Sequence, residues 1–264
     1  VDLLAVTCVS GNVHVDQAAY NVGVVLRNMD NCERIDSLPL ALRTTPIYTP
    51  IFKGCARGII SPFKKPEWEG HGKDGLGDSK ALKRDNVPQP QPEHAVTKIV
   101  ELVQASPGEV ELLFVGPLTN LAMAIRLEPS LPSLVKRLVI MGGCTQGKGN
   151  TSAAAEFNFL ADPEAAHIVL DAFQTDAAES SDIPEEGPKI SLVGWEVCLE
   201  TPLTWQFFDR LTGLLPGCSS PEGGPAAGGL DCPAAEDTLA TTKAGFCLKE
   251  VSGTMESMGR KPAG

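Results

Sequence analysis

The stretch VELLFVGPLTNLAMAIRL, residues 110–127, contains a strand, a short loop and a helix in direct succession, and it decides the fold. Residues 110–115 are apolar except for Glu111, and they are predicted to form a strand. After Gly116 and Pro117, the apolar positions 118, 121, 122 and 125 recur at helical spacing. A strand followed at once by a helix favours a parallel sheet, because parallel strands need a crossover connection.

The same alternation continues on both sides of this stretch. Further strands are predicted at 3–9 (LLAVTCV, buried on both faces), 138–141 and 190–193, and further helices at 15–26, 96–103, from 162 onward and at 201–211. Asp162 and Pro163 mark a helix start, with a capping side chain followed by proline at the first helical position. We therefore predict an α/β domain over residues 1–214, an open, mostly parallel sheet flanked by helices.

Three segments interrupt this rhythm. Residues 44–92 are rich in Pro, Gly, Lys and Asp and are predicted to form a long excursion over the sheet, as binding loops often do. Residues 174–188 are predicted to be an acidic surface insertion. Residues 215–264 are rich in Gly, Pro and Ala and are predicted to be a low-complexity, disordered tail, with a short helix at 239–248 left open.

Composition excludes several classes of protein. The net charge of −11 argues against nucleic acid or an anionic membrane as a partner. No apolar stretch approaches the roughly 20 residues of a membrane helix, and no secretory signal precedes the first strand. Eight cysteines without any C-x-x-C pair predict reduced thiols in the cytosol rather than a zinc site. The chain begins inside a predicted strand and without Met, and we interpret it as a fragment.

Polar residues follow the predicted strands, where ligands bind in open parallel sheets. They are Asn12, Asn120, Asn150, Glu156, Asn158, Trp195 and Glu196. Amides donate and accept hydrogen bonds and a carboxylate accepts them from a diol, so this set suits a neutral, hydroxyl-rich ligand such as a sugar. It does not suit phosphate, which favours Gly-rich amides with Lys or Arg. Residues 72–77 lack the spacing of a phosphate-binding loop.

Each of these residues also has a simpler explanation. Asn12 and Asn150 could be turn residues, because asparagine tolerates a left-handed backbone. Asn120, near a helix start, could be a cap, Glu156 could be solvated, and His167 could serve packing or the surface. Only their order along the chain favours a common site.

That order resembles the inosine-uridine-preferring nucleoside hydrolases, in particular their animal branch, over residues 1–213. The matching segments are LLAVTCVSGN (3–12), HGKDGLGD (71–78), ELLFVGPLTNLAMAIRLEPSL (111–131), RLVIMGG (137–143) and GNTSAAAEFNFLADPEAAHIVL (149–170). The resemblance implies hydrolysis of the N-glycosidic bond of ribonucleosides to ribose and free base. It also implies calcium as cofactor, a hard cation that takes oxygen ligands and lowers the pKa of the attacking water.

The resemblance also implies roles for individual residues. Asn12 matches the asparagine that meets the ribose and the metal site, and Val115 matches the position whose main-chain carbonyl binds calcium. Met141, Asn150, Glu156 and Asn158 match the ribose-binding set. His71 matches a position in a mobile loop that closes over the base.

Two parts of the family pattern have no match in this chain. An N-terminal D-x-D-x-x-x-D-D motif, which holds calcium and supplies the general base, would lie before Val1. A late His-Asp pair has no counterpart after residue 213. We therefore predict a chain that binds no calcium and is catalytically impaired. A non-catalytic ligand- or protein-binding variant and a poorly folding by-product stay open, as do base preference and the oligomeric state, a homo-oligomer included.

Overall fold

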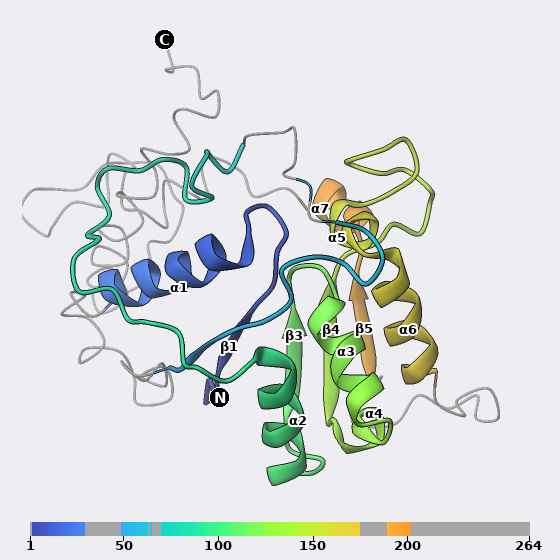
Figure 1. Ribbon diagram of the computed structural model, residues 1–264. Helices are drawn as coiled ribbons and strands as arrows, with labels where there is room; N and C mark the ends of the chain where they lie inside the picture. Colours follow the sequence, from blue (N-terminus) through green and yellow to red (C-terminus); the bar gives the residue numbers. More distant parts are fainter. Residues whose placement is uncertain (1, 30–48, 63, 65–69, 175–188, 202–264) are drawn as a thin grey trace, which may run out of the picture.

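The computed structural model describes residues 2–29, 49–62, 64, 70–174 and 189–201. Over these residues strands and helices alternate, every strand pair is parallel, and helices cover the strands (Figure 1). The predicted class, a parallel α/β fold flanked by helices, is confirmed. The predicted helix at 201–211, the disordered tail and nearly all of the acidic insertion lie outside the described residues.

The strands form two parallel ladders. They are β1 (Val6–Cys8), β2 (Ile51–Lys53), β3 (Glu111–Phe114), β4 (Arg137–Met141) and β5 (Ile190–Val193). β1 pairs with β2, and β3, β4 and β5 pair in that order. Among the described residues no backbone ladder joins β1 to β3, so the single open sheet of the sequence prediction is divided in two. The carboxyl ends within each ladder lie at one edge, because its strands are parallel.

The helices are α1 (Val15–Met29), α2 (Ala95–Ala105), α3 (Thr119–Leu127), α4 (Leu131–Leu134), α5 (Phe157–Ala161), α6 (Pro163–Phe173) and α7 (Trp195–Glu200). The helices predicted from apolar spacing correspond to α1, α2, α3 and α6. The sequence prediction missed α4, α5 and α7, which are too short to show a helical period. None of the described helices is long and apolar enough to cross a bilayer.

The main core lies between the β3–β4–β5 ladder and the helices α2, α3 and α6 (Figure 1). Leu138 and Ile140 of β4 are fully buried, as are Leu121 of α3 and Val169 of α6. A second, smaller core joins α1 to the β1–β2 ladder. Burial of these apolar faces is what drives the amphipathic segments to form helices here.

The first strand is shorter and more exposed than predicted. Leu3 and Leu4 are 41% and 49% exposed and precede β1, so the prediction of a strand over 3–9 buried on both faces is wrong at this end. β3 is likewise covered on one face only, since Leu113 and Val115 are both 69% exposed. The continuous apolar run at 3–9 predicted burial on two faces, but the described residues supply helices for one of them.

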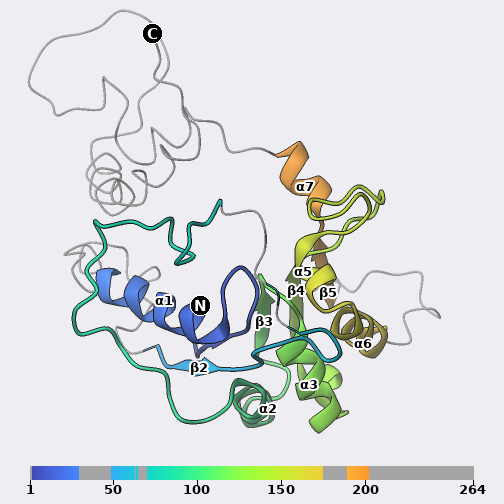
Figure 2. The same ribbon diagram turned by 45° about the horizontal axis from the view of Figure 1, so that its top comes forward.

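The segment predicted as a long excursion contains a strand. β2 lies within residues 44–92 and pairs with β1, with Val6 opposite Ile51. Its three residues, IFK, are too few to show a period-two pattern. The later part of the segment runs along α1 in two views of the molecule (Figures 1 and 2).

Candidate functional site

Two of the predicted site residues, Met141 and Asn158, meet where β4 ends, and Asn150 contacts the start of α5. Met141 is the last residue of β4, and its carbonyl oxygen accepts a hydrogen bond from Nδ2 of Asn158 at 3.0 Å. Asn158 belongs to α5 and is buried. Asn150 accepts a hydrogen bond from the Phe157 backbone N–H at 2.8 Å through its Oδ1. These hydrogen bonds leave Oδ1 of Asn158 and Nδ2 of Asn150 for other partners.

Glu156 is the N-terminal cap of α5 and is 2% exposed. Its Oε1 accepts from the backbone N–H of Asn158 at 2.9 Å, and its Oε2 accepts from those of Phe159 at 3.1 Å and Gly143 at 2.8 Å. The explanation of Glu156 as a solvated side chain is wrong. Its carboxylate joins α5 to the end of β4, because it satisfies backbone donors on both.

The pair Gly142-Gly143 lets α5 approach β4. A Cβ at Gly142 would lie 2.8 Å from the Phe159 ring and 3.3 Å from Oε2 of Glu156. Gly143 has a φ of 72°, a left-handed conformation that favours glycine. A Cβ there would lie 3.0 Å from Phe159. Both glycines are needed for the Glu156 cap to reach the strand end.

We predict that Gly143→Ala lowers the free energy of unfolding by about 2 kcal/mol, from left-handed strain plus the contact with Phe159. Gly147→Ala is the matched control, since Gly147 has a φ of 66° and a Cβ there would meet nothing within 4 Å. It carries the backbone cost alone, about 1 kcal/mol. Urea melts of both variants measure the difference, and equal losses would contradict the packing role of Gly143.

The loop after β1 lies beside this cluster. A Cβ at Gly11 would be 3.2 Å from Pro117 and 4.0 Å from the Phe157 ring. The backbone next to Asn12 therefore contacts the loop that follows Val115 and the start of α5. Asn12 is exposed, as the turn interpretation expects, and its side chain makes no hydrogen bond among the described residues.

His71 and Val115 are less closely tied to the cluster. His71 is exposed and belongs to the turn 71–78, whose Gly75 packs on Val13, the residue after Asn12. The assignment of Val115 as a metal ligand through its carbonyl stays a prediction.

Glu196, another strand-end residue, supports the loop after β4. Its Oε1 accepts a hydrogen bond from the Gln146 backbone N–H at 2.7 Å. This backbone bond is the main reason that the pKa of Glu196 lies below its usual value. The Trp195 backbone N–H donates to the Gly143 carbonyl at 2.9 Å. Both residues therefore contact the loop after β4.

Asn120 and Asp162 are buried side chains that each make several hydrogen bonds, most of which the sequence did not predict. Asn120 is 1% exposed, and its side chain donates to the Cys8 carbonyl at 2.9 Å and accepts from the Cys55 N–H at 2.8 Å. The prediction of Asn120 as a helix cap is wrong, because Leu118 occupies the cap position of α3. Its amide instead ties the ends of β1 and β2 to α3.

Asp162 caps α6 as predicted, accepting from the Ala165 N–H at 3.1 Å. It also accepts from the Thr119 hydroxyl at 2.5 Å and from the Ile59 N–H at 3.0 Å. These two bonds connect Asp162 to residues that lie 43 and 103 positions away in the sequence. No local sequence pattern predicts contacts over such separations. They shape the loop after β2.

A cavity of about 540 Å³ lies beside that loop. Its lining includes Cys55, Arg57 and Ile59 of the loop and Thr119 and Met123 of α3. Burial and the nearby Asp162 carboxylate raise the pKa of the Cys55 thiol, which keeps it protonated and unreactive at neutral pH. None of the predicted site residues is among those that line this cavity.

The described residues do not fit calcium by themselves. They contain no group of three or more His, Cys, Asp or Glu side chains placed to hold a metal ion. Calcium takes roughly six to eight oxygen ligands, several of them carboxylates. The Val115 carbonyl alone falls short of that set.

Comparison with known proteins identifies the family. The model of the inosine-uridine preferring nucleoside hydrolases matches residues 1–227. The chain belongs to the nucleoside hydrolase family. The curated relatives include the pyrimidine-specific ribonucleoside hydrolase RihB of Escherichia coli O139:H28, which is 33% identical over 172 residues, 64% of this chain and 48% of the relative.

Solved nucleoside hydrolases share its fold. A plant nucleoside hydrolase, PpNRh1, matches with a TM-score of 0.62 and 28% identity over 80% of this chain and 57% of its own. An inosine-guanosine nucleoside hydrolase matches with a TM-score of 0.64 and 27% identity over 98% and 66%. The match to the Escherichia coli relative spans about half of that protein's length.

Proposed function

We propose that this nucleoside hydrolase chain binds ribonucleosides at the carboxyl ends of its strands and contributes the ribose side of a site that cleaves the N-glycosidic bond. The observation that carries the proposal is the arrangement after β4, where hydrogen bonds join Met141 and Glu156 to Asn158. Asn150 adjoins this group, because it accepts a hydrogen bond from the neighbouring Phe157 N–H. Family membership and the names of the relatives support the substrate class.

The chemistry of this group suits a ribose. The Asn158 oxygen is an acceptor and the Asn150 amide group is a donor, the two functions that a hydroxyl needs. The three backbone donors on Glu156 hold its carboxylate in place, and Oε1 keeps one acceptor direction beyond its bond to the Asn158 N–H. Fixed polar groups of this kind favour a developing positive charge without reorganisation.

We further propose that residues 1–264 alone bind a nucleoside far better than they hydrolyse it. The described residues contain no group of three or more His, Cys, Asp or Glu side chains that could hold a calcium ion. A non-catalytic binding role is the second candidate function, and the same lack of an acidic cluster favours it. Base release with added calcium separates the two.

Titration calorimetry of residues 1–264 with inosine and with uridine, in the presence and absence of calcium, tests the proposal. We expect binding of at least one nucleoside without calcium, and base release that stays close to the uncatalysed rate. A chain that binds neither nucleoside under either condition would overturn the proposed function. Rapid base release would overturn only the proposal that this chain binds a nucleoside far better than it hydrolyses it.

Asn12→Ala is predicted to weaken nucleoside binding about tenfold, the value of one or two lost hydrogen bonds. The melting temperature should stay unchanged, because Asn12 is exposed and bonded to no other described residue. Gln174→Ala is the control, since Gln174 is an exposed amide residue that follows α6. Equal affinity of wild type and the Asn12 variant would remove Asn12 from the site.

A further inference from the structure

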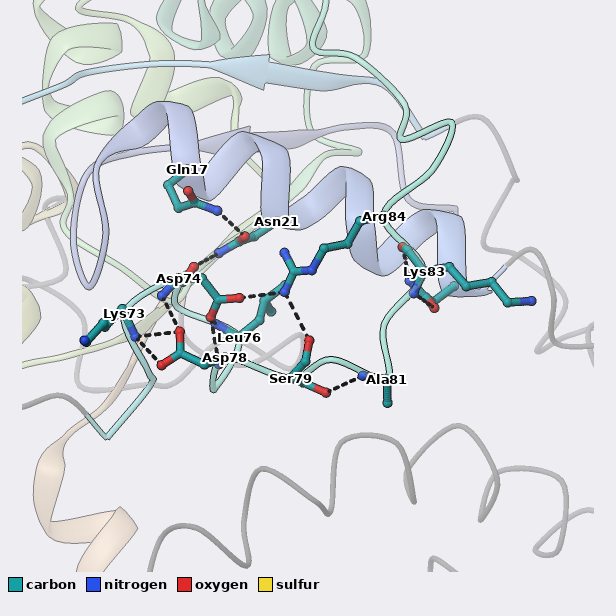
Figure 3. Close-up of polar contacts among 11 residues, drawn as sticks. Gln17, Asn21, Lys73, Asp74, Leu76, Asp78, Ser79, Ala81, Lys83 and Arg84 are labelled. Carbon is teal, nitrogen blue, oxygen red and sulfur yellow. Dashed lines mark hydrogen bonds and ion pairs between the residues drawn. The ribbon is translucent and has the colours of Figure 1, made fainter.

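Two carboxylates organise the turn 71–78 by holding its backbone N–H groups (Figure 3). Oδ1 of Asp74 accepts from the N–H groups of Leu76 at 2.8 Å and Asp78 at 2.9 Å. Oδ1 of Asp78 accepts in return from those of Lys73 at 3.0 Å and Asp74 at 3.1 Å. The side chains therefore replace the regular secondary structure that this segment lacks.

Arg84 completes the arrangement from one side. Its Nη2 lies 2.6 Å from Oδ2 of Asp74, with the two side chains 32% and 22% exposed. Burial alone would raise the pKa of Asp74, but the backbone N–H groups of Asp78 and Leu76 and the Arg84 guanidinium outweigh it and lower the pKa. Asp74 is therefore a carboxylate at neutral pH, with both oxygens bonded.

The turn is fastened to α1. Nδ2 of Asn21, a residue only 8% exposed, donates to the Asp74 carbonyl at 2.7 Å. Gln17 donates to Oδ1 of Asn21 at 2.8 Å, which fixes the orientation of that amide. Gly75 packs so closely on the helix start that a Cβ there would lie 2.8 Å from Val13. The centre of the turn is thus held against the residue that follows Asn12.

His71 belongs to the same bonded unit, because its carbonyl accepts from the Gly77 N–H at 2.7 Å. We propose that Asp74 and Asn21 are positioning residues, which fix the His71-bearing turn on α1 as a rigid wall of the nucleoside site. The proposal rests on the proposed function for its role in binding. It replaces the expectation of a mobile loop with a preorganised one, at least over residues 71–78.

Amide hydrogen exchange of residues 1–264 tests the rigidity. The N–H groups of Leu76, Gly77 and Asp78 are expected to exchange slowly in the wild type and about tenfold or more faster in Asp74→Ala. Asp85→Ala is the matched control, since Asp85 lies on the same segment and bonds Arg27 outside the turn. In Asp85→Ala the N–H groups of Leu76, Gly77 and Asp78 should still exchange slowly. Unprotected amides in the wild type would overturn the proposal.

Nucleoside affinity tests the positioning role. Asp74→Ala and Asn21→Ala are each expected to raise the Kd for the nucleoside about tenfold, and Asp85→Ala to leave it within about twofold. Asp74→Asn keeps the Oδ1 acceptor but loses the charge opposite Arg84, so it should fall between wild type and Asp74→Ala, and it serves if the alanine variant fails to fold.

The two measurements separate the ways of failing. Amides that lose protection in Asp74→Ala while the Kd stays unchanged would overturn the positioning role and leave the proposed function standing. A wild-type chain that binds no nucleoside would overturn the proposed function and the role in binding together. The exchange data would then still decide whether the turn is rigid.

Discussion

Glu156→Ala is expected to lower the free energy of unfolding by about 3 kcal/mol. The carboxylate is 2% exposed and accepts three backbone hydrogen bonds, from Gly143, Asn158 and Phe159. Its removal leaves these donors without their partner inside the protein, and an unsatisfied buried donor costs more than the net worth of its bond. Urea unfolding followed by circular dichroism measures the loss.

Two further variants make this expectation specific. Glu109→Ala removes an exposed glutamate whose side chain makes no hydrogen bond or ion pair among the described residues. It should change the free energy of unfolding by less than about 0.5 kcal/mol. Glu156→Gln keeps one acceptor oxygen and should lose less than Glu156→Ala. If Glu156→Ala were as stable as the Glu109 variant, the loop after β4 would not depend on Glu156. The role of Glu156 in holding α5 against the end of β4 would then be contradicted.

Asn120→Asp is the second large effect, with an expected loss of about 3 kcal/mol at neutral pH. The side chains have the same shape, so no cavity forms. The substitution places a carboxylate oxygen where Nδ2 of Asn120 now donates to the Cys8 carbonyl, at a position 1% exposed. It buries a charge and turns an attraction into a repulsion.

The same variant should show a characteristic pH dependence. Burial raises the pKa of the introduced carboxyl above its value in the unfolded chain. The penalty is therefore present above the folded-state pKa and shrinks as pH falls below it, because the protonated acid can again donate to Cys8. Asn12→Asp, at an exposed position, is the control. A stability difference from wild type that is equal at pH 5 and pH 8 would contradict this account.

Local sequence patterns were sufficient for the main fold. Apolar spacing located α1, α2, α3 and α6, and the Asp162-Pro163 pair located the start of α6, because these signals act within one or two helical turns. β2 and α5 were missed, since three and five residues are too few for a period. The exposure of Leu113 was not predicted. Apolar residues show that a strand can be covered by helices, but they do not show that helices cover both of its faces.

The candidate site residues were chosen by residue identity and family resemblance, and their role in a site stays a prediction. Order along the chain and family resemblance singled out Asn150, Glu156 and Asn158. In the structure Glu156 accepts from the Asn158 N–H and Asn150 from the Phe157 N–H. The bridge from Asn120 to Cys8 spans 112 positions, and no local rule could indicate it. The anchor between Asn21 and Asp74, 53 positions apart, was missed for the same reason.

Titration of the isotope-labelled chain with inosine, followed by proton–nitrogen correlation spectra, tests the central claim most directly. The account predicts saturable shifts of the side-chain amides of Asn12, Asn150 and Asn158 and of the Gly143 backbone amide. Shifts confined to Cys55–Ile59 and Thr119, around the cavity beside α3, would contradict it, because the ligand would then bind away from Asn12, Asn150 and Asn158.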